Sequence, residues 1–250
     1  MIIRKSPSEL DKMRRAGAIT AATIDRVVDA VAPGVSTLEL DRIAERYIRA
    51  EGATPSFLGY KGFTGSICAS INAEIVHGIP AADRVLADGD LVSLDFGAIW
   101  EGFHSDAAVT VFVGSPPSDD AKRLAETTEA ALDAAISMIR PGGRLSDIGH
   151  AIEQTAIGRG LGVVREYGGH GIGRALHEDP FIQNWGAAGR GPTLKPGLVV
   201  AIEPMLTLGG DGTRLLDDGW TVATADGSLA AHFEHTVAVT DDGHEVLTAR

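Results

Sequence analysis

Two aspartates lie in a segment that is otherwise typical of a buried β-hairpin. Residues 93–106 read SLDFGAIWEGFHSD, with Asp95 and Asp106 among Leu, Phe, Ile and Trp. Glu101-Gly102 is predicted to be a two-residue turn between the strands. Paired positions then sum to 203, so Asp95 and Asp106 share one face as diagonal neighbours, about 7–8 Å apart at the backbone.

Two carboxylates this close in an apolar setting need compensation. Like charges repel, and burial removes hydration, at a cost of several kcal/mol for each ion. A shared proton, a basic partner or a metal cation would offset this cost. Residues 93–106 contain no Lys or Arg, which leaves a proton-sharing pair of acids or a cation.

Three further side chains occur downstream where a solvated acid or base is not expected. His170 lies in the glycine-rich YGGHGIG, Glu203 follows the apolar VVAI, and Glu234 lies in AHFEHTVAV. Each alone is a weak signal, because single acids at strand edges and histidines in loops are common. Together, four carboxylates and one imidazole suit two ions of Mn, Fe, Co or Zn. Two such ions polarise a carbonyl and activate water, which is a hydrolytic arrangement.

The glycine-rich segment around His170 also suggests a nucleotide-binding loop. Its GGHGIG sequence does not match GxGxxG in register, so we do not favour this alternative.

The sequence predicts helices outside a set of strands. A helix capped at Ser6 is expected to continue to Val31 and stop at Pro33-Gly34, and a second begins at Ser36 and ends near Gly52. The predicted strands are Ile67–Ile71, Leu91–Trp100 and Phe103–Val113; further helices are predicted at 119–139 and 146–158, with strands and loops over 162–250.

This order repeats, and one offset relates the two copies. VAPGVSTLELDRIAERYI (31–48) resembles IRPGGRLSDIGHAIEQTA (139–156), and GDLVSLD (89–95) resembles GLVVAIE (197–203), both with an offset of 108. HGIP (77–80) and HEDP (177–180) form a third, looser pair. We therefore expect a single domain, residues 1–250, of two similar halves, 1–117 and 118–250, around an approximate two-fold axis. Chance likeness between two helix–strand units is the alternative.

Composition and charge exclude several classes of function. The net charge of −12 argues against binding to nucleic acid or to an anionic membrane surface. Cys68 is the only cysteine, so no internal disulfide forms and a reducing compartment is expected. The N-terminal residues have no secretory pattern, and no apolar run is long enough to span a membrane. The expected location is the cytoplasm.

Over nearly its full length the chain resembles the type I methionine aminopeptidases, which are M24 metallohydrolases with the pita-bread fold. The match rests on five residues in order: an Asp, an Asp in the partner strand, a His in GHGIG, a Glu before Pro and a Glu before His-Thr. They are Asp95, Asp106, His170, Glu203 and Glu234.

The resemblance implies an α+β, pita-bread (creatinase/aminopeptidase) fold, with a pseudo-two-fold antiparallel sheet and helices on its outer face. Type II members carry a subdomain inserted between the last two acids, whereas Glu203 and Glu234 are only 31 residues apart here. The short segment before the catalytic region resembles the bacterial form, which lacks an N-terminal extension.

The resemblance also implies a dinuclear, metal-dependent hydrolase that removes the N-terminal methionine from nascent proteins. Asp95 would bind one divalent ion (Co, Mn, Fe or Zn), His170 and Glu203 the other, and Asp106 and Glu234 would bridge both. A bridging hydroxide would attack the first peptide bond. The implied partners are nascent chains or peptides that begin with Met, with transient contact at the ribosome, and a monomer is implied.

Two histidines and Glu203 have implied catalytic roles. Glu203 would carry the proton, His177 would hydrogen-bond the scissile amide, and His77 would steady the leaving amide or the tetrahedral intermediate. The alternative is that both histidines are structural and satisfied by the backbone.

A pocket for the methionine side chain is implied as well. Thioethers pack well against aromatic rings, so an apolar lining suits methionine. Leu176 and Phe57 stand where an aromatic residue and a cysteine are usual in bacterial members, and a reshaped pocket is expected. Cys68 is expected to be a buried thiol rather than a nucleophile. The implied lining consists of Phe57, Tyr60, Phe63, Cys68, Leu176 and Trp220.

Three alternatives remain at the level of the sequence. A prolidase or aminopeptidase P would have the same five ligands, but those proteins usually carry an extra domain before the catalytic one. A non-enzymatic module with this fold would lose ligands, whereas this chain keeps all five. A metal-free pair of Asp95 and Asp106 sharing a proton would leave the other three residues unexplained.

Overall fold

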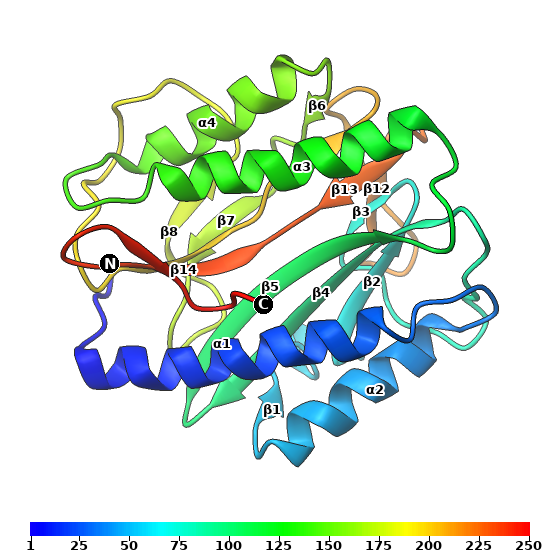
Figure 1. Cartoon of the computed structure of the whole chain (residues 1–250), viewed down its shortest axis with the longest axis horizontal. Helices are drawn as coiled ribbons and strands as arrows, with labels where there is room; N and C mark the ends of the chain where they lie inside the picture. Colours follow the sequence, from blue (N-terminus) through cyan, green and yellow to red (C-terminus); the bar gives the residue numbers. More distant parts are fainter.

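The computed structural model describes all residues, 1–250, as four α-helices packed against antiparallel sheets (Figure 1). Helix starts follow the predicted capping: the Ser6 N–H donates to Glu9 Oε2, and the Ser36 N–H donates to Glu39 Oε2. The helices are α1 (Pro7–Val28), α2 (Thr37–Ala50), α3 (Asp119–Ser137) and α4 (Leu145–Ile157), and Tyr60–Gly62 form a 3₁₀ helix, η1.

The first helix ends earlier than predicted. The prediction continued it to Val31, but α1 ends at Val28. The N–H groups of Ala30 and Val31 donate to carbonyls three residues back, those of Val27 and Val28, so the chain tightens into turns ahead of Pro33.

The first sheet contains the hairpin that carries both aspartates. Strand β4 pairs with β5 in the predicted register, with Asp95 opposite Ala108 and Asp106 opposite Gly97. Glu101 and Gly102 both have positive φ angles, of 47° and 80°, as a tight hairpin turn requires. The strands of this sheet are β1 (Thr54–Pro55), β2 (Ile67–Ile71), β4 (Leu91–Trp100) and β5 (Phe103–Phe112).

The second large sheet comes from the C-terminal half and joins the first at one point. The Glu234 N–H donates to the Ala108 carbonyl at 2.9 Å, and the Asp106 N–H donates to Thr236 Oγ1 at 2.9 Å. These bonds bring together the strands from which the acids project. The sheet has the order β15 (His244–Val246), β14 (His235–Val239), β9 (Val199–Ile202), β7 (Gly168–Gly171) and β8 (Glu178–Gln183).

Two small antiparallel sheets complete the architecture. One has the order β13 (Ala230–His232), β10 (Met205–Thr207) and β6 (Gly162–Val163). The other has the order β11 (Thr213–Leu215), β12 (Val222–Thr224) and β3 (Glu74–Val76), which pairs a strand of each half.

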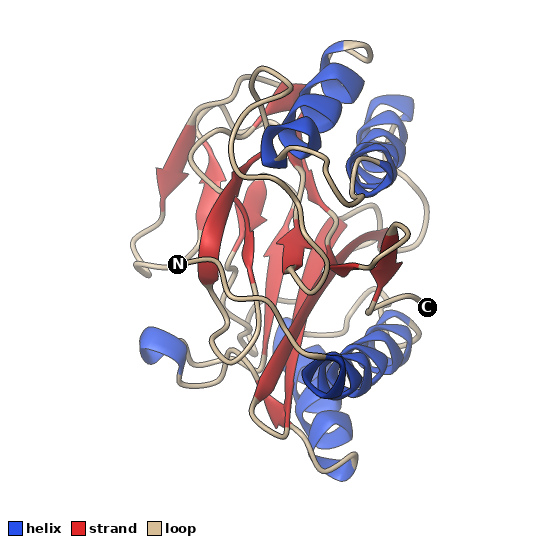
Figure 2. Ribbon diagram, turned by 90° about the vertical axis from the view of Figure 1, so that its left-hand side faces the viewer, coloured by secondary structure: helices blue, strands red, loops and turns tan.

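All four α-helices cover one side of the sheets, whereas the short η1 lies on the other side (Figure 2). Between helices and strands lies a core cluster of 37 buried residues. Burial of this apolar surface is the main force that holds the helix layer to the sheets. The face without α-helices is left free for a site.

Backbone contacts of the two halves correspond at the predicted offset of 108. The Gly34 N–H donates to the Leu86 carbonyl, and the Gly142 N–H donates to the Leu194 carbonyl. Isolated β-bridges pair Ser36 with Val85 and Arg144 with Thr193, again 108 apart. We keep the division into halves 1–117 and 118–250 as a proposal that these matched contacts support.

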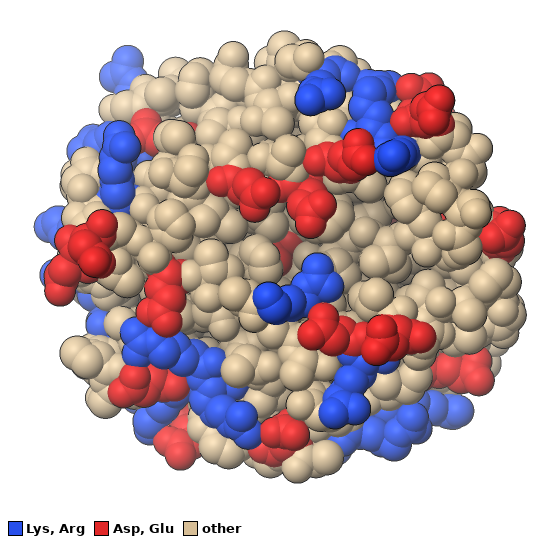
Figure 3. All heavy atoms as spheres, viewed as in Figure 1, with Lys and Arg blue, Asp and Glu red and all other residues tan.

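None of the helices is both long enough and apolar enough to cross a lipid bilayer. On the face that carries the helices, acidic and basic side chains intermingle, and no continuous basic surface is present there (Figure 3). This face offers no basic footprint for a nucleic acid.

Candidate metal centre

The five predicted ligands meet where the two large sheets join. Asp95 and Asp106 come from β4 and β5, and His170 from β7. Glu203 directly follows β9, and Glu234 directly precedes β14. Neighbouring strands present these side chains on one side of the sheet because residues two apart share a face. All five line a single cavity.

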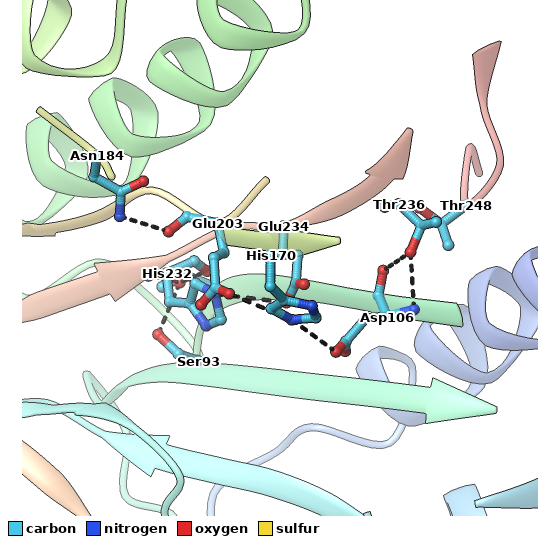
Figure 4. A network of polar contacts seen from close by, with 10 residues as sticks. Ser93, Asp106, His170, Asn184, Glu203, His232, Glu234, Thr236 and Thr248 are labelled. Atoms are coloured by element: carbon cyan, nitrogen blue, oxygen red, sulfur yellow. Dashed lines mark hydrogen bonds and ion pairs between the residues drawn. The ribbon is translucent and has the colours of Figure 1, made fainter. Parts of the chain in front are cut away.

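The ligand atoms lie close together and away from solvent (Figure 4). One atom from each of Asp106, His170 and Glu234 lies within 4.8 Å of the other two. His170 Nε2 is 3.8 Å from Asp106 Oδ2 and 3.6 Å from Glu203 Oε1. His170 Nδ1 lies 2.9 Å from the Gly171 carbonyl and donates its proton there, which leaves the Nε2 lone pair facing the acids.

Electrostatics make this arrangement unfavourable without a cation. Burial, aided by the charges of neighbouring acids, raises the pKa of Asp106, Glu203 and Glu234 well above the ordinary value. Burial raises the pKa of Asp95 to about 7 and lowers the pKa of His170 to about 3. Each group is thus driven toward its neutral form.

The protein itself supplies no compensating charge. None of the four carboxylates forms an ion pair with Lys or Arg. Buried oxygens of Asp95, Asp106 and Glu234 have no hydrogen-bond partner. This set of donors fits two divalent cations. The cations would neutralise the four carboxylates and would bind the oxygens that lack hydrogen-bond partners and the Nε2 lone pair of His170. One proton shared by two aspartates would leave Glu203 and Glu234 uncompensated.

The predicted methionine pocket opens directly beside this centre, in the same cavity of about 190 Å³. The Phe63 and Trp220 rings meet edge to face at 5.1 Å. Burial, followed by the charge of Asp95, raises the pKa of the Cys68 thiol well above its ordinary value, so this cysteine is unsuited to nucleophilic chemistry. All six predicted residues line the cavity: Phe57, Tyr60, Phe63, Cys68, Leu176 and Trp220.

The two predicted catalytic histidines flank the acids. His177 Nδ1 lies 2.9 Å from the Tyr60 hydroxyl, and its ring is 4.2 Å from that of His170, centroid to centroid. The His77 ring has no hydrogen-bond partner, and its backbone has a φ of 62°, unusual for a side chain of this size. Neither ring has a hydrogen bond to the backbone, and the catalytic roles of the two histidines stay a prediction.

Sequence reasoning missed two residues at the site. Lys61 lines the cavity. His232 is buried beside the acids, with Nε2 3.9 Å from Glu203 Oε2 and 3.7 Å from Glu234 Oε2. Burial lowers the pKa of His232 to about 3, so its ring is neutral. The spacing of His232 two residues before Glu234 could have revealed it, because residues two apart in an extended segment share a face.

Comparisons with known proteins define the class. The model of Metallopeptidase family M24 matches residues 11–241. Methionine aminopeptidase 1 of Mycobacterium tuberculosis is 56% identical over 254 residues, which cover 99% of this chain and 95% of that protein. The crystal structure of methionine aminopeptidase from Thermotoga maritima has a TM-score of 0.98 and 42% identity, with 100% of both chains covered.

Another M24-like fold is more distant. Xaa-Pro dipeptidase from Bacillus anthracis has a TM-score of 0.78 and 26% identity, and the match covers 99% of this chain but 62% of that one. The fold is therefore the predicted pita-bread fold. The chain belongs to metallopeptidase family M24, and within it to the type I methionine aminopeptidases.

Proposed function

We propose that this chain removes N-terminal methionine from peptides and nascent proteins by hydrolysing the first peptide bond with two divalent metal ions. One observation carries the proposal: four carboxylates and an imidazole with a free Nε2 lone pair converge in one cavity, next to its apolar wall, and no Lys or Arg pairs with them. The family supports the same activity.

The proposed ligand roles are those that the likeness to the methionine aminopeptidases implies. Asp95 would help to hold one ion, His170 and Glu203 would help to hold the other, and Asp106 and Glu234 would contribute to both. The ions, when bound, supply polarisation of the substrate carbonyl and activation of water. Mn, Fe, Co and Zn all suit this set of oxygen and nitrogen donors.

Glu203 is the proposed proton carrier. Its side chain retains some exposure, 15%, whereas those of Asp106 and His170 are only 6% and 7% exposed. During hydrolysis the C–N bond breaks and the departing amine needs a proton. Glu203 takes this proton from the attacking water and delivers it to that nitrogen.

His177 is proposed to bind the scissile amide. A phenol is the usual donor to a neutral imidazole, so the Tyr60 hydroxyl donates to Nδ1 and the ring proton of His177 lies on Nε2. His177 can then donate from Nε2 to the substrate carbonyl oxygen. His77 is proposed to steady the leaving amide or the tetrahedral intermediate.

Methionine is proposed to bind in the cavity with its side chain against the apolar wall. The thioether would pack on Phe63 and Trp220, whose edge-to-face contact keeps the wall in place. Phe57 and Leu176 would complete the wall, and they set how closely the pocket fits methionine.

Hydrolysis assays on matched peptides test the function. The metal-stripped protein should be inactive on Met-Ala-Ser and should regain activity with Co(II) or Mn(II). Full activity in the presence of a chelator would exclude the metal mechanism. Faster hydrolysis of Xaa-Pro peptides than of Met-Ala-Ser would assign the chain to the prolidase-like branch.

We further propose that the protein acts in the cytoplasm as a monomer and contacts the ribosome transiently while it trims nascent chains. The absence of a membrane-crossing helix and the single cysteine are compatible with this setting. Light scattering of the purified protein and co-sedimentation with translating ribosomes test the two parts separately.

A further inference from the structure

His232 is a buried imidazole at the metal centre that none of the roles above uses. It is the last residue of β13, and the residue is only 2% exposed. Its Nε2 has no hydrogen-bond partner and lies 3.7 Å from Glu234 Oε2 and 3.9 Å from Glu203 Oε2 (Figure 4). The nitrogen is thus nearly equidistant from oxygens of two proposed ligands.

Hydrogen bonds to Thr110 hold the backbone of His232 in place. Thr110 Oγ1 donates to the His232 carbonyl at 2.7 Å and accepts from the His232 N–H at 2.9 Å. Ser93 Oγ, 2.9 Å from Thr110 Oγ1, donates to it, because the single Thr110 hydroxyl proton already goes to His232. Both backbone groups of His232 are thus fixed, which sets the direction of its Cα–Cβ bond toward the acids.

The two imidazoles of the centre differ in what holds their Nδ1. His170 Nδ1 donates to the Gly171 carbonyl, so Nε2 carries a lone pair ready for a metal. The structure gives His232 Nδ1 no such acceptor. A lone pair on His232 Nε2 would face two carboxylate oxygens and be repelled, whereas an N–H there would be attracted by both.

We propose that His232 is a positioning residue: its Nε2–H donates a shared hydrogen bond to Glu203 and Glu234, and so sets the two carboxylates at the spacing that the metal ions require. Each Glu203 oxygen then faces a different imidazole, Oε1 toward His170 and Oε2 toward His232. A shift of under about 1 Å closes the contact to hydrogen-bond length. The proposal rests on the proposed dinuclear function.

Three substitutions separate this role from others. His232→Gln keeps an N–H donor of similar reach, His232→Leu keeps volume without a donor, and His232→Asn has a donor that is too short. His244→Gln is the matched control, because His244 binds the Ile139 carbonyl outside the cavity. Calorimetric titration with Mn(II) and the visible spectrum of the Co(II) form are measured alongside kcat and KM on Met-Ala-Ser.

Groups that support metal ligands typically contribute 10–100-fold to metal affinity or activity. We expect His232→Leu and His232→Asn to bind Mn(II) about 10-fold or more weakly and to lower kcat with little change in KM. His232→Gln should restore affinity and kcat to within about threefold of wild type, with an unchanged Co(II) spectrum. Circular dichroism and Tm of the metal-free variants verify folding. If the His232→Leu variant does not fold, the His232→Asn variant takes its place.

Two results overturn the proposal. If His232→Leu and His232→Asn both bind Mn(II) with wild-type affinity, no positioning contact exists. If His232→Gln instead changes the Co(II) spectrum and binds metal weakly, the His232 nitrogen itself ligates the metal. Failure of the proposed function is distinguishable, because wild-type protein would then bind no divalent ion or leave Met-Ala-Ser intact.

Discussion

The two halves of the molecule share a framework and differ in what they bring to the site. Their helices and turns correspond at an offset of 108 residues, down to the bridges of Ser36 with Val85 and of Arg144 with Thr193. The first half contributes two aspartates from one hairpin with ten-residue strands. The second contributes both glutamates and both imidazoles of the centre from strands of three to five residues or their ends.

The difference shows which part of the proposed repeat is free to change. Asp95 and Glu203 occupy matched positions, yet their side chains differ in length by one carbon. Contacts between helices and sheets constrain the common framework, because a change there disturbs the core. Side chains that face the cavity are less constrained by this packing, and there the two proposed halves carry different chemistry.

The largest expected effect concerns the two acids proposed to lie between the ions, one from each half. Asp106→Asn and Glu234→Gln should each lower kcat/KM on Met-Ala-Ser by more than about 100-fold, beyond the 10–100-fold typical of groups that only support ligands. Both metal-free variants should keep or raise their Tm, because a buried charge is removed. If only one of the two variants lost activity, the two halves would not contribute equivalent ligands to the centre.

Removal of the metal should make stability depend on pH. Burial raises the pKa of Asp95 to about 7 in the folded chain, above the unfolded value of about 3.9, and it also raises the pKa values of Asp106 and Glu234. Folding is thus favoured where these acids are protonated, and that contribution is lost as pH rises through the folded pKa.

The Tm of the metal-free protein, followed by circular dichroism, should therefore fall from pH 5 to pH 8 relative to the Mn(II)-loaded protein. The gap between the two should widen with pH, because bound ions stabilise the charged carboxylates. A constant gap over this range would contradict the electrostatic account of the centre.

The pocket has walls from both halves, and substitutions there test whether each half contributes. Phe57→Ala and Leu176→Ala each open the wall, which should lower kcat/KM on Met-Ala-Ser by about 10-fold, in the range for lost apolar contacts in a pocket. The metal affinity of both variants should equal that of wild type. If kcat/KM is unchanged in either variant, the residue replaced there does not contact the methionine side chain.

The smallest expected effect concerns the shared framework. Gly34 and Gly142 have φ angles of 89° and 86°, and a Cβ at either position would meet no atom within 4 Å. Gly34→Ala and Gly142→Ala should therefore each reduce the free energy of unfolding by about 1 kcal/mol through backbone strain alone. Urea denaturation measures both, and clearly unequal losses would argue against matched roles in the two halves.

The sequence predicted the hairpin register and the five converging residues because each signal was local or repeated. The Glu101-Gly102 turn fixed which residues pair, and the acids stood out against apolar neighbours. The end of α1 was wrong by three residues, since tight turns at helix ends depend on the packing that follows. His232 was missed although it lies two residues before Glu234, because only the fold brings Glu203 from a distant segment to the same place and shows that the His232 ring faces both acids.

The most direct test of the account is the location of metal in crystals grown with Mn(II), by anomalous scattering. We expect two peaks in the cavity, one against Asp95 and one against His170 and Glu203, with Asp106 and Glu234 touching both. A cavity without a peak, or peaks only at surface carboxylates, would contradict the claim that these buried acids converge to hold two cations.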